Sequence, residues 1–351
     1  MALPFASVVI VNAKGTHRLE RCLQSVLKTN YPSFEIVVAD CLTSNIERFM
    51  HTSFPQATLV HFDKDVGPAE EHNAGFRATS HHSDYVAFLD NDTEVSSNWL
   101  REAVAVMETD SSIGAAQSKL LLMSDPSVID SAGHYLDTYG FHIERTGRDL
   151  GQYDRIEELL GAKGASLTVR RKAFEQVGGY DPSLFIQFDD VDLCWRMWLR
   201  GYKVVFAPKS VVYHVGSTTK GSPPRLIFYV KRNEIASMIK NYEIRNLVRF
   251  LSGRVIIEVR NVVRLLAKGN LRESFATARA LISNLVGFPL VWKNRMDVQY
   301  RLRRVSDEQV MKRVFWKPRF PLAFYLLMLH RVFLSEFLRA WRSTDQYERY
   351  D

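Results

Sequence analysis

The sequence predicts an α/β protein with a mixed, mostly parallel sheet flanked by helices, followed by a basic helical C-terminal extension. In the first half, short runs rich in Val and Ile alternate with amphipathic helical patterns, as in parallel sheets covered on both faces. From about residue 225 the pattern becomes almost entirely helical, with Arg recurring every few positions. A length of 351 residues suits about two domains, which we place at 1–224 and 225–351.

Five apolar runs in the first part are predicted to be buried strands, because each is short and bounded by polar or turn-forming residues. They cover residues 5–12, 34–40, 57–62, 85–90 and 113–122. Between them, three segments repeat apolar residues at helical spacing, namely 19–28, 69–78 and 98–107. The first run lacks a basic segment and a cleavage site, so we expect a strand there and not a signal peptide.

The region after the fifth run is less regular. Residues 123–160 are polar without a sustained period, and we expect a hairpin and a mobile loop there. Residues 161–171 regain strand character, 190–200 show helical spacing, and 203–206 form a short apolar run. Residues 218–224 combine Gly, Ser and paired Pro, which predicts a linker before the helical extension.

The charges are divided unevenly along the chain. Residues 225–351 carry 25 Lys and Arg against 11 Asp and Glu, whereas the rest carries 21 against 28. Basic amphipathic helices with aromatic residues often lie in an anionic membrane surface, which is the partner we expect for this region. A solvated helical face over the first domain is the alternative. Nucleic acid is not expected, because no recognised binding motif is present.

The basic residues of this region fall into two sets, which are Arg249, Arg254, Arg260, Arg264, Lys268 and Arg272, and then Arg301, Arg303, Arg304, Lys312, Arg313, Lys317 and Arg319. Two apolar runs follow, at 321–329 and 332–341. No uninterrupted apolar stretch reaches the roughly 18 residues of a membrane span. The three cysteines are widely spaced without a C-x-x-C pair, which argues against a disulfide framework or a zinc knuckle.

A first acidic cluster follows the predicted strand at 85–90. Asp90-Asn91-Asp92 places two carboxylates one residue apart at a strand end, where they can share a hard cation. Neighbouring carboxylates repel each other unless a cation or a proton neutralises them. A solvated turn is the alternative, since Asp and Asn favour turns.

A second acidic cluster lies just before the helix predicted at 190–200. Asp189, Asp190 and Asp192 stand among Phe and Trp residues, so we expect at least one carboxylate to be partly desolvated and suited to general-base catalysis. The alternative is that these acids complement the helix dipole. His214 follows a strand-like segment in the same half of the chain, which makes it a candidate metal ligand.

Together these segments resemble the family 2 inverting glycosyltransferases with the GT-A fold. The resemblance is closest to the branch of rhamnosyl-, galactofuranosyl- and N-acetylglucosaminyl-transferases of cell-surface glycan assembly, and it covers about residues 5–235. Its most specific part contains, in order, a small-residue strand, Arg170-Arg171, Gly-Gly-Tyr-Asp at 178–181, Asp-Asp-x-Asp-Leu at 189–193, and His214.

The resemblance implies roles for individual residues. Asp90, Asp92 and His214 would hold a divalent metal, Mn²⁺ or Mg²⁺, that binds the donor diphosphate, and Asp190 would be the catalytic base. The other matching positions would contact the substrate, with Asp40 on the uracil or thymine ring and Arg232 on the diphosphate. They are Asp40, Gly67, Asn73, Gly75, Asp90, Gly164, Asp189 and Arg232.

The resemblance also implies the activity. The enzyme would transfer a sugar from a UDP- or dTDP-linked donor to a hydroxyl of a glycan or lipid-linked acceptor in cell-surface polysaccharide synthesis. Residues 1–122 would bind the nucleotide-sugar and 123–224 the acceptor. We expect a cytoplasmic protein attached peripherally to the inner face of the cell membrane, and the sequence indicates no oligomeric state.

Three positions depart from the family pattern. Asn45 stands where the family has a second acid after the second strand, Lys14 lies where another Asn is frequent, and Asp189 replaces a Glu. A sugar-nucleotide-forming nucleotidyltransferase is an alternative, although Asn12-Ala-Lys-Gly is a poor substitute for that class's phosphate loop. A non-catalytic binding protein on the same fold is a second, and the intact acids and His214 argue against it.

Overall fold

The computed structural model describes residues 3–216 and 223–317. By its internal contacts the chain divides into two compact units. The first comprises Met1–His134 and Glu144–Thr219, and the second comprises Tyr135–Ile143 and Lys220–Asp351. The sequence placed a single boundary at residue 224 and gave no sign that the short segment Tyr135–Ile143 belongs with the C-terminal helices.

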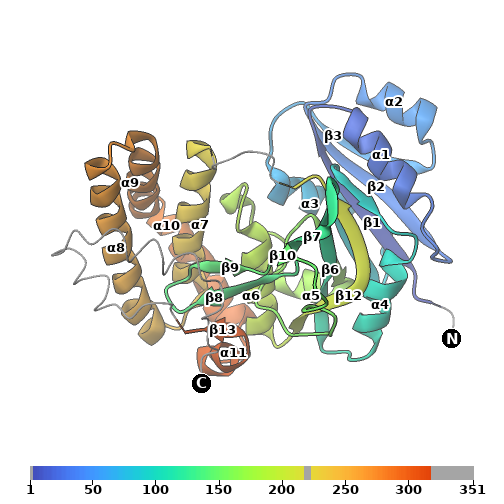
Figure 1. Cartoon of the computed structure of the whole chain (residues 1–351). Helices are drawn as coiled ribbons and strands as arrows, with labels where there is room; N and C mark the ends of the chain where they lie inside the picture. The colour runs from blue at the N-terminus through green and yellow to red at the C-terminus, as the bar shows by residue number, and fades with distance from the viewer. Residues whose placement is uncertain (1–2, 217–222, 318–351) are drawn as a thin grey trace. The chain divides into compact units, whose positions relative to one another are not determined.

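The first unit is built on one large mixed sheet, drawn in Figure 1. Its strands are β1 (Ala6–Ala13), β2 (Phe34–Cys41), β3 (Ala57–Phe62), β4 (Tyr85–Asp90), β5 (Thr93–Val95), β6 (Ile113–Leu122), β7 (Asp125–Ser131), β10 (Gly147–Arg148), β11 (Ser166–Arg170) and β12 (Lys203–His214). The main order is β10-β7-β6-β11-β4-β1-β2-β3, and β12 pairs with β5 and β6. Strands β3, β2, β1 and β4 are mutually parallel, whereas β11 runs antiparallel between β4 and β6. The predicted fold class is therefore confirmed.

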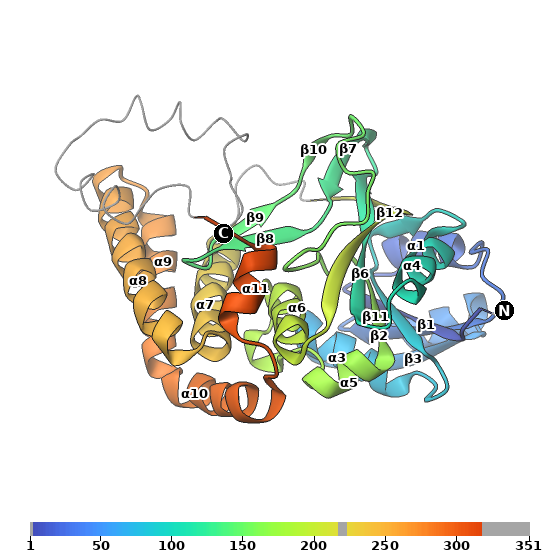
Figure 2. The same ribbon diagram turned by 90° about the horizontal axis from the view of Figure 1, so that it is seen from below.

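Helices cover both faces of this sheet (Figure 2). They are α1 (His17–Val26), α2 (Ile46–Ser53), α3 (Pro68–Ala78), α4 (Trp99–Glu108), α5 (Arg171–Val177) and α6 (Asp189–Arg200), with a 3₁₀ turn at Pro182–Leu184. Alternate residues of β1, β2 and β4 enter one core with apolar side chains of α1, α2 and α4. On the opposite face α3 approaches closely, because Gly75 has no side chain and a Cβ there would lie 2.3 Å from Val9.

Most predicted elements of the first unit lie within two residues of the observed ones. Helices α2 and α5 and the strands within 123–160 were not individually predicted. Strand β12 is longer than the predicted 203–206, and it shifts register between Ala207 and Val211. Pro208 lies in this interval and has no N–H to donate to the ladder, which favours an irregularity there.

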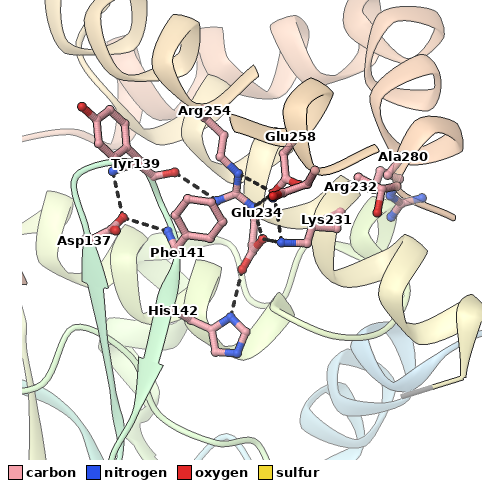
Figure 3. A network of polar contacts seen from close by, with 12 residues as sticks. Asp137, Tyr139, Phe141, His142, Lys231, Arg232, Glu234, Arg254, Glu258 and Ala280 are labelled. Carbon is pink, nitrogen blue, oxygen red and sulfur yellow. Dashed lines mark hydrogen bonds and ion pairs between the residues drawn. The ribbon is translucent and has the colours of Figure 1, made fainter. Parts of the chain in front are cut away.

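The second unit is mainly helical. It contains α7 (Pro224–Asn241), α8 (Ile244–Ala267), α9 (Leu271–Val286), α10 (Phe288–Met296), a π-helical turn at Asp297–Leu302, and α11 (Asp307–Val314). A small sheet, β13-β8-β9, joins β8 (His134–Asp137), β9 (His142–Glu144) and β13 (Phe315–Trp316). Figure 3 shows the polar contacts that tie the β8–β9 turn to α7 and α8.

The structure corrects part of the predicted basic surface. Arg254 and Arg260 were expected among the residues that face a membrane, but both are buried. Arg254 is buried because Glu234 and Glu258 neutralise its charge within the helical unit. Arg319 and the apolar runs at 321–329 and 332–341 lie outside the described residues.

Candidate active site

The predicted metal ligands converge at the ends of β4 and β12. Asp90 is the last residue of β4, Asp92 follows in the tight turn to β5, and His214 ends β12. Strand β12 pairs with β5 so that His214 lies opposite Thr93, next to Asp92. One ligand atom from each of Asp90, Asp92 and His214 lies within 4.8 Å of the others. Two carboxylates and an imidazole therefore face one point, as a divalent cation requires.

The electrostatics of this cluster are those of a site with an excess of negative charge. Burial and the neighbouring Asp92 raise the pKa of Asp90 to about 6. Burial alone would raise the pKa of Asp92, but the hydrogen bond and charge of His214 lower it. Burial also opposes the charge on His214, yet Asp130 and Asp92 raise the pKa of this imidazole to about 9. A cation at this point would relieve the same repulsion that the proton on His214 relieves now.

Asp130 and Lys163 belong to the cluster but were not predicted. Asp130 lies on β7, and its Oδ2 is 2.8 Å from His214 Nδ1 and 2.8 Å from Lys163 Nζ. Lys163 also pairs with Glu144 at 3.3 Å. Asp130 comes from the polar stretch 123–160, where no period or motif distinguishes one acid from another. Only the pairing of β6 with both β7 and β12 brings it near His214.

The three acids at the start of α6 have different environments. Asp192 is buried and pairs with Arg196 at 2.8 Å, which assigns it to packing. Asp189 is buried, and its burial together with the charge of Asp190 raises its pKa well above the usual range. Asp190 is half-buried, and its two oxygens accept hydrogen bonds from the backbone N–H groups of Gly164 and Val191, both at 2.7 Å.

Asp190 therefore combines an oriented carboxylate with access to solvent. Its negative charge is among those that raise the pKa of Asp90, after burial and the charge of Asp92, so the two acidic clusters act on one site. Gly164, predicted to contact substrate, contacts Asp190 through its N–H. The partly desolvated carboxylate expected from the aromatic flank is Asp189 more than Asp190.

A chain of polar side chains continues from Asp90 and Asp92 across the ends of the parallel strands. The register places Asn12 opposite Asp40 and Asp40 opposite His61. Asn91 donates to Asn12 at 2.6 Å, Asn12 donates to Asp40, and His61 Nδ1 lies 2.7 Å from Asp40 Oδ2. Asp40 is fully buried. It orients Asn12 and His61, and its predicted contact with a nucleobase stays a prediction.

Gly67, Asn73 and Gly75 have structural roles in α3 and the residue before it. Asn73 donates to the carbonyl oxygen of Tyr180 at 3.0 Å and accepts from its N–H at 2.9 Å, which fastens the Gly-Gly-Tyr loop to α3. Gly67 has a φ of 79°, and a Cβ there would lie 2.7 Å from the Phe185 ring. Contact of these three residues with a nucleotide remains a prediction.

Arg232 lies on α7, in the second unit. Its Nε donates to Asn233 Oδ1 at 2.7 Å, and its guanidinium lies 5.1 Å from the centre of the Tyr229 ring. Asn284 of α9 donates to the carbonyl oxygen of Arg232 at 3.1 Å. The predicted contact of Arg232 with a diphosphate remains a prediction.

Comparisons with known proteins show which family and which fold this chain resembles. The sequence profile of the family described as "Glycosyltransferase like family 2" matches residues 4–235. The chain is 26% identical over 160 residues to a pre-mycofactocin glycosyltransferase of Mycobacterium tuberculosis, which covers 44% of this chain and 32% of that protein. It is 41% identical over 61 residues to an N-acetylglucosaminyl-diphospho-decaprenol L-rhamnosyltransferase of the same species, covering 17% of this chain and 20% of that protein. The chain thus spans about a third or less of these relatives' length.

Two solved structures share the fold. GalNAc-T7, solved with UDP, GalNAc and Mn²⁺, superposes with a TM-score of 0.58 at 18% identity, covering 72% of this chain and 51% of that one. The mannosyltransferase PcManGT from Pyrobaculum calidifontis, solved with GDP-Man and Mn²⁺, superposes with a TM-score of 0.52 at 15% identity, covering 80% and 87%.

Proposed function

The chain belongs to the glycosyltransferase-like family 2, and we propose that it is a metal-dependent inverting glycosyltransferase. It would move a sugar from a UDP- or dTDP-linked donor to a hydroxyl of a glycan or lipid-linked acceptor. The observation that carries this proposal is the convergence of Asp90, Asp92 and His214 on one point, with the oriented carboxylate of Asp190 acting on the same site.

The donor set fits a divalent cation. Two carboxylate oxygens suit Mg²⁺ or Mn²⁺, and an imidazole nitrogen favours Mn²⁺. A cation held there would offset the negative charge that develops on the departing diphosphate. The Mn²⁺ named for the GalNAc-T7 and PcManGT structures supports this choice.

Asp190 is the residue we assign as base. An acceptor hydroxyl is a weak nucleophile until a positioned group removes its proton. The N–H groups of Gly164 and Val191 fix the direction of the Asp190 carboxylate, and each oxygen keeps a lone pair to accept a proton. A single base with no covalent intermediate inverts the anomeric carbon.

Incubation with sugar nucleotides tests this proposal. We expect UDP or dTDP with Mn²⁺ to raise the melting temperature, since a ligand at 100 times its Kd stabilises by about 2.7 kcal/mol. Proton NMR of UDP-N-acetylglucosamine, UDP-glucose and dTDP-rhamnose, with GDP-mannose for comparison, should show cleavage to a sugar of inverted configuration. EDTA should abolish this cleavage. A product of retained configuration, or equal rates in EDTA, would contradict the mechanism.

We also propose that the second unit attaches to the anionic, cytoplasmic face of the cell membrane. Large apolar side chains on α8, α9 and α10 are exposed, among them Val248, Val259, Val263, Phe275, Ile282, Leu285 and Leu290. Exposed basic residues accompany them, namely Arg245, Arg249, Arg272, Arg279 and Lys293. Among the described residues no single helix is long and apolar enough to span a membrane. The helix pair Leu271–Val286 and Phe288–Leu302, bent by 60°, has the required length and apolarity when the two are taken together.

Vesicle sedimentation tests this attachment. The full chain should pellet with phosphatidylglycerol vesicles at low salt and partly release at high salt, because salt screens the basic residues. Phe275→Asp and Leu285→Asp, at positions 69% and 77% exposed, should reduce pelleting. Leu150→Asp, at a position 82% exposed in the first unit, is the matched control. Equal pelleting with neutral and anionic vesicles would contradict the proposal.

A further inference from the structure

The strongest unassigned feature is the second partner of His214. The imidazole presents Nε2 to Asp92 Oδ1 at 3.3 Å and Nδ1 to Asp130 Oδ2 at 2.8 Å. The side chains of His214 and Asp130 are each only 10% exposed. The ring is therefore held at both nitrogens, by Asp92, a proposed cation ligand, on one side and by Asp130, which is not a proposed ligand, on the other.

This arrangement indicates which nitrogen would face a cation. An ionised carboxylate only accepts hydrogen bonds, so Nδ1 must carry a proton when it bonds Asp130. Nε2 also faces a carboxylate, that of Asp92, and can donate to it while the ring is protonated. When the ring is neutral and Nδ1 keeps its proton on Asp130, the lone pair is on Nε2, on the side of Asp92. A carboxylate behind a ligating histidine fixes the ring orientation and increases the basicity of the nitrogen that binds metal.

Asp130 is itself held in place. Lys163 Nζ donates to Asp130 Oδ2 at 2.8 Å and to Glu144 Oε1 at 3.3 Å. The next residue, Gly164, donates its backbone N–H to Asp190. Two adjacent residues before β11 thus position both parts of the site. Lys163 acts on His214 through Asp130, and Gly164 orients Asp190, the proposed base.

We propose that Asp130 is a positioning residue that holds His214 with Nε2 directed at the cation site of Asp90 and Asp92, and that Lys163 holds Asp130 in turn. This inference rests on the metal site of the proposed function. Nothing in the sequence motifs assigns Asp130 a role, and it need not touch the donor, the acceptor or the cation.

The experiment measures Mn²⁺ affinity without any sugar nucleotide, from the electron paramagnetic resonance signal of free Mn²⁺. We expect Asp130→Ala to weaken Mn²⁺ binding by about 10- to 100-fold, the usual effect of losing such a partner. Asp130→Asn keeps an acceptor oxygen and should lie between Asp130→Ala and the wild type, and it serves as the second variant if Asp130→Ala does not fold. Asp125→Asn, an exposed acid at the start of the same strand, is the control and should bind as the wild type does.

A double-mutant cycle separates positioning from general damage. If Asp130 acts through His214, adding Asp130→Ala to His214→Ala should change Mn²⁺ affinity by less than about 2-fold. An equal loss in both backgrounds would overturn the inference, as would wild-type affinity in folded Asp130→Ala. A wild-type chain that binds no Mn²⁺ would overturn the metal site itself, and is distinguished from the other outcomes because it needs no variant.

Discussion

Each unit contains one cluster of charged side chains, and the two clusters differ in how far nearby cations balance the negative charge of their carboxylates. In the second unit, Arg254 lies between Glu234 and Glu258, and Lys231 Nζ lies 2.9 Å from Glu258 (Figure 3). His142 Nδ1 lies 2.9 Å from Glu234. In the first unit, the candidate site holds four acids, Asp90, Asp92, Asp189 and Asp190. The cations near them include His214, Lys163 and the exposed Arg18, which pairs with Asp92 at 3.3 Å.

The pKa values show the consequence of this difference. Burial opposes ionisation of Glu234, but the charges of Arg254 and Lys231 overcome it and lower the pKa of this carboxyl. At the candidate site the balance is reversed, since burial and acidic neighbours raise the pKa of Asp90 and of Asp189. A buried network whose charges are matched needs nothing further. A cluster with an excess of carboxylates would gain from a cation, as we propose for this site, and the following variants test that distinction.

The largest expected effect is on chemistry at the unmatched site. Asp190→Asn keeps the shape of the side chain but removes the proposed base, so sugar transfer should fall by about 10²- to 10⁴-fold while Mn²⁺ and donor affinity stay near wild type. Rates of transfer and Mn²⁺ titrations measure the two quantities separately. Asp189→Asn is the control and should reduce the chemical step less. Transfer at the wild-type rate in Asp190→Asn would show that Asp190 is not the base.

The next effect is on stability in the matched network. Arg254→Met leaves Glu234 and Glu258 buried beside Lys231 without the guanidinium that contacts both carboxylates. Removal of one member of a buried ion pair costs about 3–5 kcal/mol. The free energy of unfolding from urea titration should fall by that amount. Arg249→Met, at an exposed position on the same helix, should change it by about 0.5 kcal/mol or less. If both substitutions lowered the free energy of unfolding by similar amounts, the buried ion pairs of Arg254 would contribute no more to stability than an exposed Arg does.

The residues of the candidate site could be predicted from the sequence better than those of the Arg254 network. Asp90, Asp92, Asp190 and His214 were predicted because strand ends and a family motif mark them. Asp130 was not, because its contact with His214 joins residues 84 positions apart, one of them in a stretch without period. The network of Arg254 was also missed, since helical spacing alone does not distinguish a buried Arg from an exposed one. Burial depends on partners such as Glu234, on another helix.

The strands and longer helices of the first unit were predicted because buried strands and amphipathic helices leave a periodic pattern. The two-residue strands β10 and β13 are too short to leave one. Helix α2 was missed because its eight residues bury only Ile46 and Met50. The membership of Tyr135–Ile143 in the second unit depends on tertiary contacts, such as the hydrogen bond that Arg254 donates to the carbonyl oxygen of Tyr139.

Asp137 tests whether Arg254 also neutralises a third nearby carboxyl group. Burial raises the pKa of Asp137 from 3.8 to about 7, although the N–H of Phe141 and the charge of Arg254 lower it. The folded state therefore binds more protons than the unfolded state between about pH 4 and 7, so stability falls as pH rises through that range. Asp137→Asn keeps an acceptor for the N–H groups of Tyr139 and Phe141 and removes this titration.

Thermal unfolding from pH 5 to 8 measures the effect. The melting temperature of Asp137→Asn relative to wild type should rise with pH, by the equivalent of a few kcal/mol at most. Asp125→Asn, which replaces an exposed acid, should show no such trend. A constant difference between Asp137→Asn and wild type over this range would mean that Asp137 is ionised throughout and that Arg254 neutralises it as well.

The smallest expected effect is the change in stability when one carboxylate is neutralised by substitution. Its sign should be opposite in the two clusters. Asp90→Asn removes a carboxylate whose pKa is raised to about 6, so above pH 6 it removes a repulsion that destabilises the metal-free protein. With EDTA at pH 7.5 we expect this variant to be more stable than wild type by about 1–3 kcal/mol.

Removal of a carboxylate from the matched network, as in Glu234→Gln, should instead destabilise, because it leaves less negative charge to neutralise the buried Arg254. With Mn²⁺ the order should reverse at the site, since wild type gains stability from the cation and Asp90→Asn does not. Destabilisation of metal-free Asp90→Asn would mean that the acids of the first unit are already neutralised within the fold, like those of the second, and have no need of a cation.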